Sequence, residues 1–264
     1  MKTDKVYKML SIAGSDNTCG AGIQADIKTC HALNSYCLTC VTTITSQNSK
    51  SVFKIYELPC IYIKSQINSI LKDYKIDCIK IGLISSVSQA QTISQILHKF
   101  ESKVPIVVDP IFKSSTNKKF NNFKNYVSIY KTIANISPIF TPNLDEARIL
   151  LEIKCNTKIN TEEIMKEFID KFESKVVVTD GGNRLGYCED FLIDQGIIEK
   201  FVSTKIASQN THGSGCTFSS ALAINLAKGF SLKKSVKLSK DFTRKCILRA
   251  PKFNLQYGPV GHWL

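Results

Sequence analysis

The sequence predicts an α/β fold in which a mainly parallel central sheet carries helices on both faces. Apolar, strand-like runs alternate with amphipathic, helical runs along the chain. Several of the strand-like runs end in glycine or in a carboxylate, and ligands of parallel sheets bind at that edge. The length is 264 residues, of which 43% are hydrophobic, so the chain can bury a full core. We therefore expect residues 1–264 to form a single domain.

The first half of the chain shows this alternation most regularly. Ser15 and Asp16, in a small-residue turn at 14–20, are candidates for turn and capping roles or for ligand contacts, because ligands often bind after the first strand of such a sheet. A polar loop is expected at 45–48. The predicted strands of this half are 6–13, 36–43, 78–83 and 104–110, and the predicted helices are 21–33, 59–74 and 87–100.

The second half continues the pattern without a repeat, a low-complexity tract or a linker that would divide the chain. A polar, lysine-rich stretch at 113–125 predicts a mobile loop that leads to a short helix. The remaining predicted strands are 139–141, 176–182 and strand-like segments within 185–207, and the remaining predicted helices are 142–151, 162–172, one from 218 and 232–249.

Composition narrows the class of protein. No apolar run is long enough to span a membrane, and the N-terminus lacks the features of a signal peptide, so we expect a cytoplasmic protein without a membrane partner. Ten irregularly spaced cysteines favour free thiols over disulfides. The net charge of +13 comes from lysines spread along the chain, which favours a solvated basic surface over nucleic-acid binding.

A glycine-rich loop at 210–217 is the strongest single indication of a binding site. It leads directly into an Ala- and Leu-rich helical run, so free N–H groups and the helix dipole would favour a phosphate there. Gly213 and Gly215 let the backbone approach a ligand closely. Cys216 lies where a helix N-terminus can lower a thiol pKa from about 8.5 toward neutrality. The simpler alternative is a helix that begins with glycines and buries a small cysteine.

Two further stretches supply oxygen atoms suited to a cation. Asp109 ends an apolar strand at the edge where ligands and metals collect, and its ordinary alternative is a helix cap. Asn143 and Glu146 are three residues apart and would share the first turn of a helix. They could form an ordinary capping box, or they could serve a hydrated Mg²⁺ beside a phosphate.

These motifs together resemble the hydroxymethylpyrimidine and phosphomethylpyrimidine kinases of thiamine biosynthesis, within the ribokinase-like superfamily. The resemblance extends over nearly the whole chain. It is most specific in Gly-Ala-Gly-Ile-Gln-Ala-Asp at 20–26 and Thr-His-Gly-Ser-Gly-Cys-Thr at 211–217. The other matching segments are Ser-Ile-Ala-Gly-Ser-Asp at 11–16, Lys-Ile-Gly-Leu at 80–83, Val-Val-Asp-Pro at 107–110 and Thr-Pro-Asn-Leu-Asp-Glu-Ala at 141–147.

The resemblance implies ATP and Mg²⁺ as co-substrates, a small hydroxymethyl heteroaromatic compound as acceptor, and a homodimer. The implied site residues fall into four groups. The substrate-binding candidates are Gly14, Ala21, Asp26, Gln47 and Leu83, although Asp26 could equally be a solvated helical carboxylate; the anion-hole candidates are Gly213, Ser214, Gly215 and Cys216; the ATP-binding candidates are Thr179, Thr211 and His212; and the metal-site candidates are Asp109, Asn143 and Glu146. Cys216 is also the candidate catalytic base, unless the loop acts through its N–H groups alone.

Several residues depart from the family pattern. Cys19 lies in the first loop, where glycine is usual, and is expected near the substrate. Leu83 replaces a usual methionine, which conserves volume. Asp180 replaces a common lysine, so one positive contact to the nucleotide is expected to be missing. The flap at 113–117 lacks its usual glycine. These changes affect the expected substrate preference more than the reaction class.

Three other functions compete with this prediction. A pyridoxal kinase of the same superfamily would phosphorylate a hydroxymethyl group on a pyridine; Gln47 and Leu83 favour the pyrimidine over it. A catalytically weak nucleotide or pyrimidine sensor is suggested only by Asp180 and the altered first loop, and the complete anion loop argues against it. A nucleic-acid-binding protein is suggested by the net charge alone.

Overall fold

The central sheet of the computed structural model has nine strands in the order β3-β2-β1-β4-β5-β6-β7-β8-β9. The structure describes residues 5–100, 103–113, 119–120, 122–154, 157–182 and 186–263. The strands are β1 (Tyr7–Asp16), β2 (Ser35–Gln47), β3 (Val52–Glu57), β4 (Cys78–Ile81), β5 (Ile106–Val108), β6 (Ile139–Phe140), β7 (Lys175–Gly182), β8 (Tyr187–Asp194) and β9 (Ile197–Thr204).

The predicted parallel sheet is confirmed. All neighbouring strands from β2 through β7 in the sheet order pair in parallel. Antiparallel pairing is confined to the ends of the sheet, where β3 pairs with β2 and β8 and β9 extend β7. The parallel strands therefore bring all their carboxyl ends to one edge.

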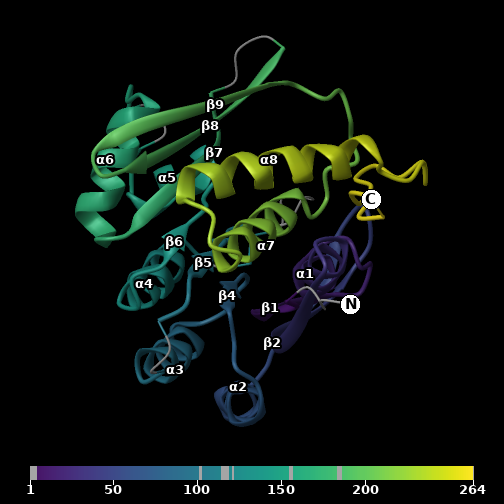
Figure 1. Ribbon diagram of the computed structural model, residues 1–264, viewed down its shortest axis with the longest axis vertical. Coiled ribbons are helices and arrows are strands. Elements are labelled where there is room, and N and C mark those ends of the chain that lie inside the picture. Colours follow the sequence, from purple (N-terminus) through teal and green to yellow (C-terminus); the bar gives the residue numbers. More distant parts are fainter. Residues whose placement is uncertain are drawn as a thin grey trace.

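Helices cover both faces of the sheet, as the sequence predicts (Figure 1). α1, α7 and α8 pack on one face around an apolar cluster that includes Met9, Leu222 and Val236. The others pack on the opposite face, around a larger cluster that includes Ile63, Phe140 and other apolar residues. The helices are α1 (Gly22–Ala32), α2 (Cys60–Asp73), α3 (Val87–His98), α4 (Phe123–Ala134), α5 (Leu144–Leu150), α6 (Thr161–Phe172), α7 (Ser214–Ala227) and α8 (Leu232–Leu248).

The structure corrects four of the predicted elements. β1 and β2 run to Asp16 and Gln47, so the expected turn and polar loop begin later than predicted; residues 45–47 are held as a strand by pairing with β3. The strand β3 was not predicted at all. α4 is a twelve-residue helix rather than a short one, and α7 begins at Ser214 rather than at 218. Residue 185, the predicted start of the 185–207 segments, and residues 114–118 and 121 of the predicted loop lie outside the described residues.

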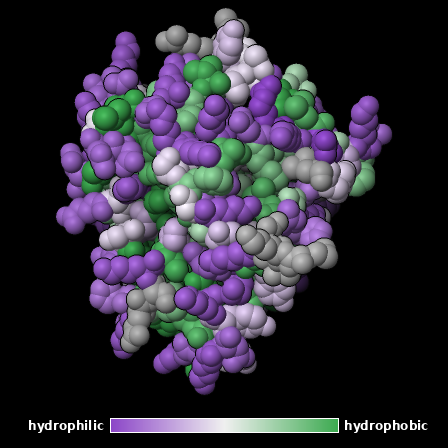
Figure 2. All heavy atoms as spheres, in the orientation of Figure 1, coloured by the Kyte–Doolittle hydropathy of each residue, from purple (hydrophilic) through white to green (hydrophobic). Residues whose placement is uncertain are grey.

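The surface agrees with the distribution of charge along the sequence. Hydrophilic side chains are spread over the face in view, with apolar ones between them (Figure 2). Within the described residues, no helix is both long and apolar enough to cross a membrane. The cysteines that the structure describes are all free thiols, in agreement with the prediction.

Candidate active site

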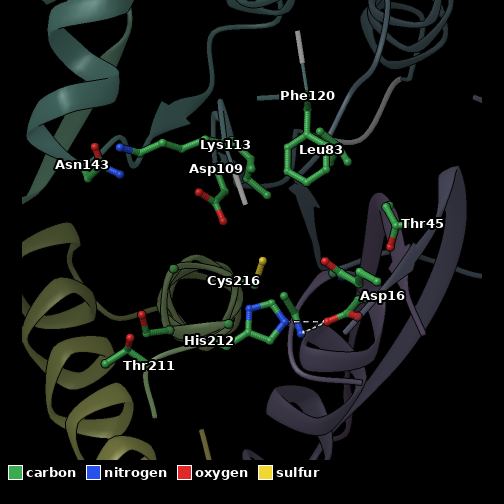
Figure 3. Close-up of a pocket in the computed structure, with 18 of the residues that line it drawn as sticks. Asp16, Thr45, Leu83, Asp109, Lys113, Phe120, Asn143, Thr211, His212 and Cys216 are labelled. Atoms are coloured by element: carbon green, nitrogen blue, oxygen red, sulfur yellow. Dashed lines mark hydrogen bonds and ion pairs between the residues drawn. The ribbon is translucent and has the colours of Figure 1, made fainter. Parts of the chain in front are cut away.

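A cavity of about 380 Å³ lies at the carboxyl edge of the sheet, between the ends of the parallel strands and the N-terminus of α7. Its walls come from segments far apart in the sequence, and their side chains converge on it (Figure 3). All of the predicted site residues except Asp26 line it: Gly14, Ala21, Gln47, Leu83, Asp109, Asn143, Glu146, Thr179, Thr211, His212, Gly213, Ser214, Gly215 and Cys216.

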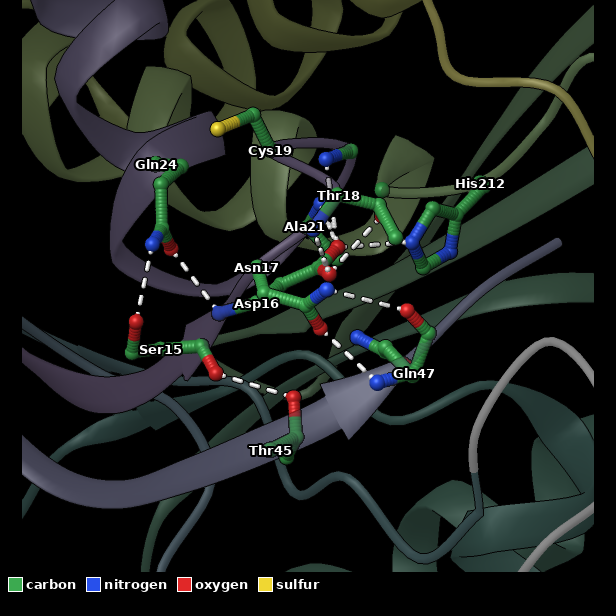
Figure 4. Close-up of polar contacts among 12 residues, drawn as sticks. Ser15, Asp16, Asn17, Thr18, Cys19, Ala21, Gln24, Thr45, Gln47 and His212 are labelled. Carbon is green, nitrogen blue, oxygen red and sulfur yellow. Dashed lines mark hydrogen bonds and ion pairs between the residues drawn. The ribbon is translucent and has the colours of Figure 1, made fainter. Parts of the chain in front are cut away.

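Asp16 organises the loop between β1 and α1. Its carboxylate accepts hydrogen bonds from the N–H groups of Thr18, Gly20 and Ala21, and from the hydroxyl of Thr18 (Figure 4). It also contacts Nε2 of His212 at 2.8 Å. Burial alone would raise the pKa of Asp16, but the hydrogen bonds from His212 and Thr18 outweigh it and hold this pKa well below its ordinary value. Of its two expected roles, the turn role is the one that the hydrogen bonds support.

The His212–Asp16 contact locks the first loop to the glycine loop, although these residues are 196 positions apart. The two loops also touch through their backbones. A Cβ atom at Gly213 would lie 1.8 Å from the carbonyl oxygen of Gly20, and one at Gly20 would lie 2.2 Å from the His212 ring. A side chain at Gly213 would therefore force the opposite loop to move, whereas one at Gly20 would displace the His212 ring.

The C-terminal tail holds the glycine loop from the other side. The N–H of His212 donates to the carbonyl of Gly258, and the N–H of Val260 donates to the carbonyl of His212. The ring of His262 contacts the hydroxyl of Thr217 at 2.9 Å. The loop that opens α7 is thus fixed between the first loop of the chain and its last described residues.

The N-terminus of α7 lines the cavity at the loop where the anion site is predicted. Gly213 is the residue before the helix and has a φ of +85°, in the left-handed region that favours glycine. No side chain caps this helix end. Ser214, Gly215 and Cys216 line the cavity; the N–H of Ser214 donates to the carbonyl of Thr211, which leaves those of Gly215 and Cys216 for a ligand. Such a helix end attracts anions, because its dipole and its free N–H groups act together.

Cys216 is buried beside this helix end, and its thiol differs from the expectation. Burial raises the pKa of Cys216 to about 12, although the nearby Lys80 lowers it in part. The predicted shift toward neutrality is therefore wrong: burial raises the thiol pKa more than Lys80 and the N–H of Gly22 lower it. A thiol with this pKa is protonated at neutral pH, and forming its thiolate at pH 7 would cost about 7 kcal/mol.

Asp109 and Glu146 are buried carboxylates that face the same cavity. Burial raises the pKa of both; for Glu146, burial and the charge of Asp109 raise it to about 8. Asn143 and Glu146 also form the ordinary capping box: the Asn143 side chain accepts from the N–H of Glu146, and the Glu146 carboxylate accepts from the N–H of Asn143. Of the two predicted roles for this pair, the capping role is present.

The same carboxylates suit a divalent cation. Mg²⁺ usually takes one or two carboxylates and completes its shell with water and phosphate oxygens, and a cation would relieve the repulsion between Asp109 and Glu146. Within the described residues, no cluster of three or more His, Cys, Asp or Glu side chains forms a site made of protein ligands alone. The donor set therefore fits a hydrated Mg²⁺ better than a metal enclosed by protein.

The opposite wall of the cavity suits a flat, uncharged ring. Gly14 lies so close to Leu83 that a Cβ there would be 3.0 Å from a Leu83 methyl group. Phe120 lies beside Leu83 (Figure 3). Gln47 is fixed through its backbone, which exchanges two hydrogen bonds with the side chain of Asn17 (Figure 4). Among the described residues its side-chain amide has no hydrogen-bond partner, so it can serve a ligand.

A second cavity, of about 430 Å³, adjoins the first. The two share Asn143, Thr179, Thr211, Ser214 and Gly215, so the anion loop lies at their junction. Thr179 and Thr211, both predicted to contact ATP, line both cavities. His212, the third candidate, lines only the first, where its ring contacts Asp16.

Asp26 requires a correction. It was expected to bind substrate or to be solvated, but it is fully buried, and its carboxylate forms an ion pair with Lys80 at 3.0 Å. The helical spacing that places Asp26 on α1 does not reveal that the helix turns this residue toward the sheet. The ion pair is formed with a lysine that the sequence analysis assigned no role.

Sequence reasoning also missed residues that line the first cavity. Lys113 begins the predicted flap and Phe120 follows it, Thr141 follows β6, and Tyr257 comes from the C-terminal tail. Only Thr141 had a signal, since it begins a segment with a recognisable motif. The others reach the cavity through tertiary packing, which local patterns do not report.

Comparisons with known proteins agree on a family. The family model described as phosphomethylpyrimidine kinase matches residues 16–261. The chain belongs to this family. A hydroxymethylpyrimidine/phosphomethylpyrimidine kinase of Staphylococcus aureus is 32% identical over 258 residues, which are 96% of this chain and 92% of that protein.

Other relatives are longer. A probable chloroplastic bifunctional enzyme of thiamine biosynthesis from rice is 34% identical over 256 residues, and a bifunctional thiamine biosynthesis protein of Geobacter sulfurreducens is 33% identical over 261 residues. These matches cover 96% and 97% of this chain but only 46% and 52% of the relatives. The chain thus spans about half the length of these bifunctional relatives.

Solved structures confirm the ribokinase-like kinase fold. The pyridoxal kinase of S. aureus in complex with pyridoxal superposes with a TM-score of 0.83 at 27% identity, covering 98% of this chain and 94% of that one. The same kinase has also been solved with ADP and with AMP-PCP. The phosphomethylpyrimidine kinase of Clostridium difficile superposes with a TM-score of 0.75 at 31% identity, covering 91% and 99% of the two chains.

The departures from the phosphomethylpyrimidine kinase pattern now have structural contexts. Cys19 is exposed and lies outside the cavity, so the expectation that it lies near the substrate is wrong; it adopts a φ of +61°, which explains why glycine suits this position. Asp180 lines the second cavity. Arg244 of α8 brings positive charge there, whereas Lys240 of α8 is ion-paired with Asp190 of the same cavity at 2.6 Å. In the flap, Lys113 lines the first cavity, while residues 114–117 lie outside the described residues.

Proposed function

We propose that this chain transfers a phosphoryl group from ATP to 4-amino-5-hydroxymethyl-2-methylpyrimidine and then to the resulting monophosphate, supplying the pyrimidine half of thiamine. The observation that supports this most strongly is the junction of the two cavities at the N-terminus of α7. A ring-sized site lies on one side of the anion loop, and a second site, lined by Lys240 and Arg244, lies on the other. In-line phosphoryl transfer requires this order of acceptor, anion loop and nucleotide.

Different residues of the two cavities would bind the pyrimidine, stabilise the transferring group and contact ATP. Gly14, Ala21 and Leu83 would hold the faces of the pyrimidine, while the Gln47 amide hydrogen-bonds its polar edge. The N–H groups at 213–216 would stabilise the charge that develops on the transferring group. Thr179 and Thr211, at the junction of the cavities, would contact the phosphates of ATP.

Mg²⁺ belongs to this proposal as a co-substrate ion. Asp109 and Glu146 would hold it, with Asn143 fixing Glu146 through the capping box. When bound, the ion neutralises phosphate charge. The raised pKa of Glu146 supports this assignment, because a bound cation would stabilise the carboxylate form that burial disfavours.

We also propose a cytoplasmic homodimer. The sheet edge supports a second copy as its partner, since Phe53 and Tyr56 of β3 are 66% and 62% exposed and Ile44 of the adjacent β2 is 51% exposed. Light scattering after gel filtration would measure the mass in solution. A monomer at micromolar concentration would contradict the dimer and leave the kinase proposal untouched.

A pyridoxal kinase is the second candidate. The superpositions on pyridoxal kinases have the higher TM-scores, 0.83 against 0.75 for the phosphomethylpyrimidine kinase. Pyridoxal also carries a hydroxymethyl group on a flat ring, so the same cavity could hold it. The unpartnered amide of Gln47 favours the pyrimidine, whose ring nitrogen and amino group offer it both an acceptor and a donor.

Acceptor-dependent release of ADP by the purified protein with Mg²⁺ tests these alternatives. Hydroxymethylpyrimidine, its monophosphate and pyridoxal are compared in parallel, with Gln47→Leu as a variant that keeps side-chain size but removes the amide. We expect kcat/KM to be highest for the pyrimidines and to fall for them in the variant. A preference for pyridoxal would support the second candidate, and no acceptor-dependent ADP would support a sensor.

A further inference from the structure

Helix α7, which carries the anion loop, is buried on every side. All of its residues from Cys216 to Asn225 are buried. Most helices are oriented by an apolar stripe that faces the core and a polar face that remains in water. A helix that is buried all round has no such contrast, so other contacts must fix its rotation about its own axis.

Two hydroxyl groups on consecutive residues of α7 make those contacts. The Ser219 hydroxyl lies 3.4 Å from the Asp109 carboxylate but closer to two carbonyls of its own helix, at 3.0 and 3.1 Å. The Ser220 hydroxyl donates to Oδ1 of Asp26 over 2.7 Å. The second bond is short and ends on a charged acceptor, which makes it the stronger of the two. Both lie in the helix turn that follows the anion loop.

Asp26 is itself held rigidly. Lys80 Nζ of β4 lies 3.0 and 3.1 Å from its two carboxylate oxygens, and the hydroxyl of Ser11 on β1 donates to it over 2.6 Å. The side chains of Asp26 and Lys80 are both completely buried. Two strands, α1 and α7 therefore meet at one carboxylate directly behind the cavity.

Stability alone does not account for this arrangement. A buried ion pair often contributes little to stability compared with apolar residues of similar size, because both charges lose their hydration. Buried pairs can instead select one arrangement among several packings of similar energy. The contact with Ser220 gives the pair a structural element to orient.

We propose that Asp26 and Lys80 are a positioning pair which, through Ser220, sets the rotation of α7 and so aims the N–H groups at 213–216 toward the transferring phosphoryl group. The inference rests on the proposed kinase function for its chemistry. Neither residue touches the cavity. Besides the charge of Lys80, which acts on Cys216 and Asp109 directly, their effect on the reaction passes through the direction of the helix end, where small errors in geometry can cost about 100-fold in rate.

The variant Ser220→Ala tests this with little disturbance, because it removes one hydroxyl and leaves the ion pair in place. Ser239→Ala is the matched control: Ser239 is a fully buried serine of α8 whose hydroxyl accepts from the Asn225 side chain, at the opposite end of α7. Both variants lose one buried hydrogen bond to α7. Only Ser220→Ala loses the bond next to the anion loop.

We expect Ser220→Ala to lower kcat at least about tenfold while the KM for hydroxymethylpyrimidine stays within about twofold of wild type. Ser239→Ala should keep wild-type kcat. Amide hydrogen exchange at 213–217, which needs no activity, should accelerate in Ser220→Ala and stay unchanged in Ser239→Ala. Equal kcat values and equal exchange in the two variants would overturn the proposal.

Asp26→Asn provides a second test, because it keeps the shape of the side chain and leaves Lys80 without its counter-charge. We expect the same loss of kcat and faster exchange at 213–217. Normal exchange there in folded Asp26→Asn would contradict the positioning role. If wild-type protein releases no acceptor-dependent ADP, the kinase function fails, and the exchange data still decide whether the pair orients α7.

Discussion

Cys216 shows how burial can reverse an expectation based on local structure. A helix N-terminus lowers a thiol pKa in solvated surroundings, but here burial raises it to about 12. General base catalysis is worth about 3 to 5 kcal/mol, less than the about 7 kcal/mol needed to preform a thiolate at pH 7. A preformed thiolate is therefore not the base. Cys216 can take the alcohol's proton only if it passes its own proton on at the same time, and the hydrogen-bonded Asp109 carboxylate is the acceptor beside it.

Replacement of Cys216 by alanine separates the two phosphorylation steps. The alcohol must lose a proton when it attacks, whereas the monophosphate attacks through an oxygen that is already anionic. We expect Cys216→Ala to lower kcat for hydroxymethylpyrimidine by about 100-fold or more and kcat for the monophosphate much less. Steady-state rates with each acceptor measure this. Equal losses would show that Cys216 does not act as a base.

Gly213 offers a test of the contact between the two loops. Gly213→Ala would bring a Cβ against the Gly20 carbonyl, whereas Gly229, which has a similar φ of +84°, has open space around it. Both substitutions carry the cost of a left-handed alanine, about 1 kcal/mol. We expect Gly213→Ala to lose nearly all activity and Gly229→Ala to keep it. The Tm of Gly213→Ala should be several degrees below that of Gly229→Ala. Similar Tm and activity in the two variants would contradict a tight contact.

At the scale of elements, α5 combines structural and chemical roles in one turn. Glu146 caps the helix and also faces the cavity. Its pKa is raised from 4.5 to about 8, so between these values the folded state holds a proton that the unfolded state has lost. Stability must then fall as pH rises from about 4.5 to about 8.

Glu146→Gln should remove this pH dependence. In the presence of a chelator, we expect the Tm of wild type to fall between pH 5 and pH 8 when compared with the Tm of the variant. Added Mg²⁺ should reduce this fall. Glu163→Gln is the control, because Glu163 is exposed and forms the same capping box on α6. Thermal denaturation across this pH range measures the effect. A pH-independent difference would show that Glu146 is not held protonated.

The elements also show what the sequence could predict. Alternating apolar and amphipathic runs identified the parallel strands and most helices, because these elements are buried on defined faces. The strand β3 was not predicted, because five of its six residues are exposed and buried and exposed positions therefore do not alternate along it. Candidate site residues with glycine-rich or strand-end motifs were found, Asp16 among the candidates. The contact of Asp16 with His212 and the cavity positions of Phe120 and Tyr257 could not be predicted, since they depend on segments distant in the sequence.

At the scale of the molecule, a histidine of the C-terminal tail makes the stability of the fold depend on pH. Burial lowers the pKa of His262 to about 4, and its ring contacts Thr217 of α7. Below pH 6.5, the ordinary pKa of histidine, His262 gains a proton in the unfolded state but stays neutral in the folded state. Stability therefore falls as pH drops from about 6.5 to about 4.

His262→Gln should lose this acid sensitivity. We expect wild type to lose more Tm than the variant between pH 7 and pH 4.5, with His31→Gln, at an exposed position on α1, behaving as wild type. Activity at pH 7 should fall only modestly, because glutamine can still reach Thr217. Identical acid profiles for wild type and His262→Gln would show that His262 accepts a proton freely in the fold.

The contact between Asp16 and His212 has a consequence for how the chain folds while the ribosome synthesises it. Ribosomes add about 5 to 20 residues per second, so the 196 positions between these residues separate their appearance by about 10 to 40 s. During that interval the first loop exists without its partner, and neither ATP nor a pyrimidine could stabilise the nascent chain through the anion loop. Ligand concentration in the cell should therefore influence the persistence of finished molecules but not the early stages of their folding.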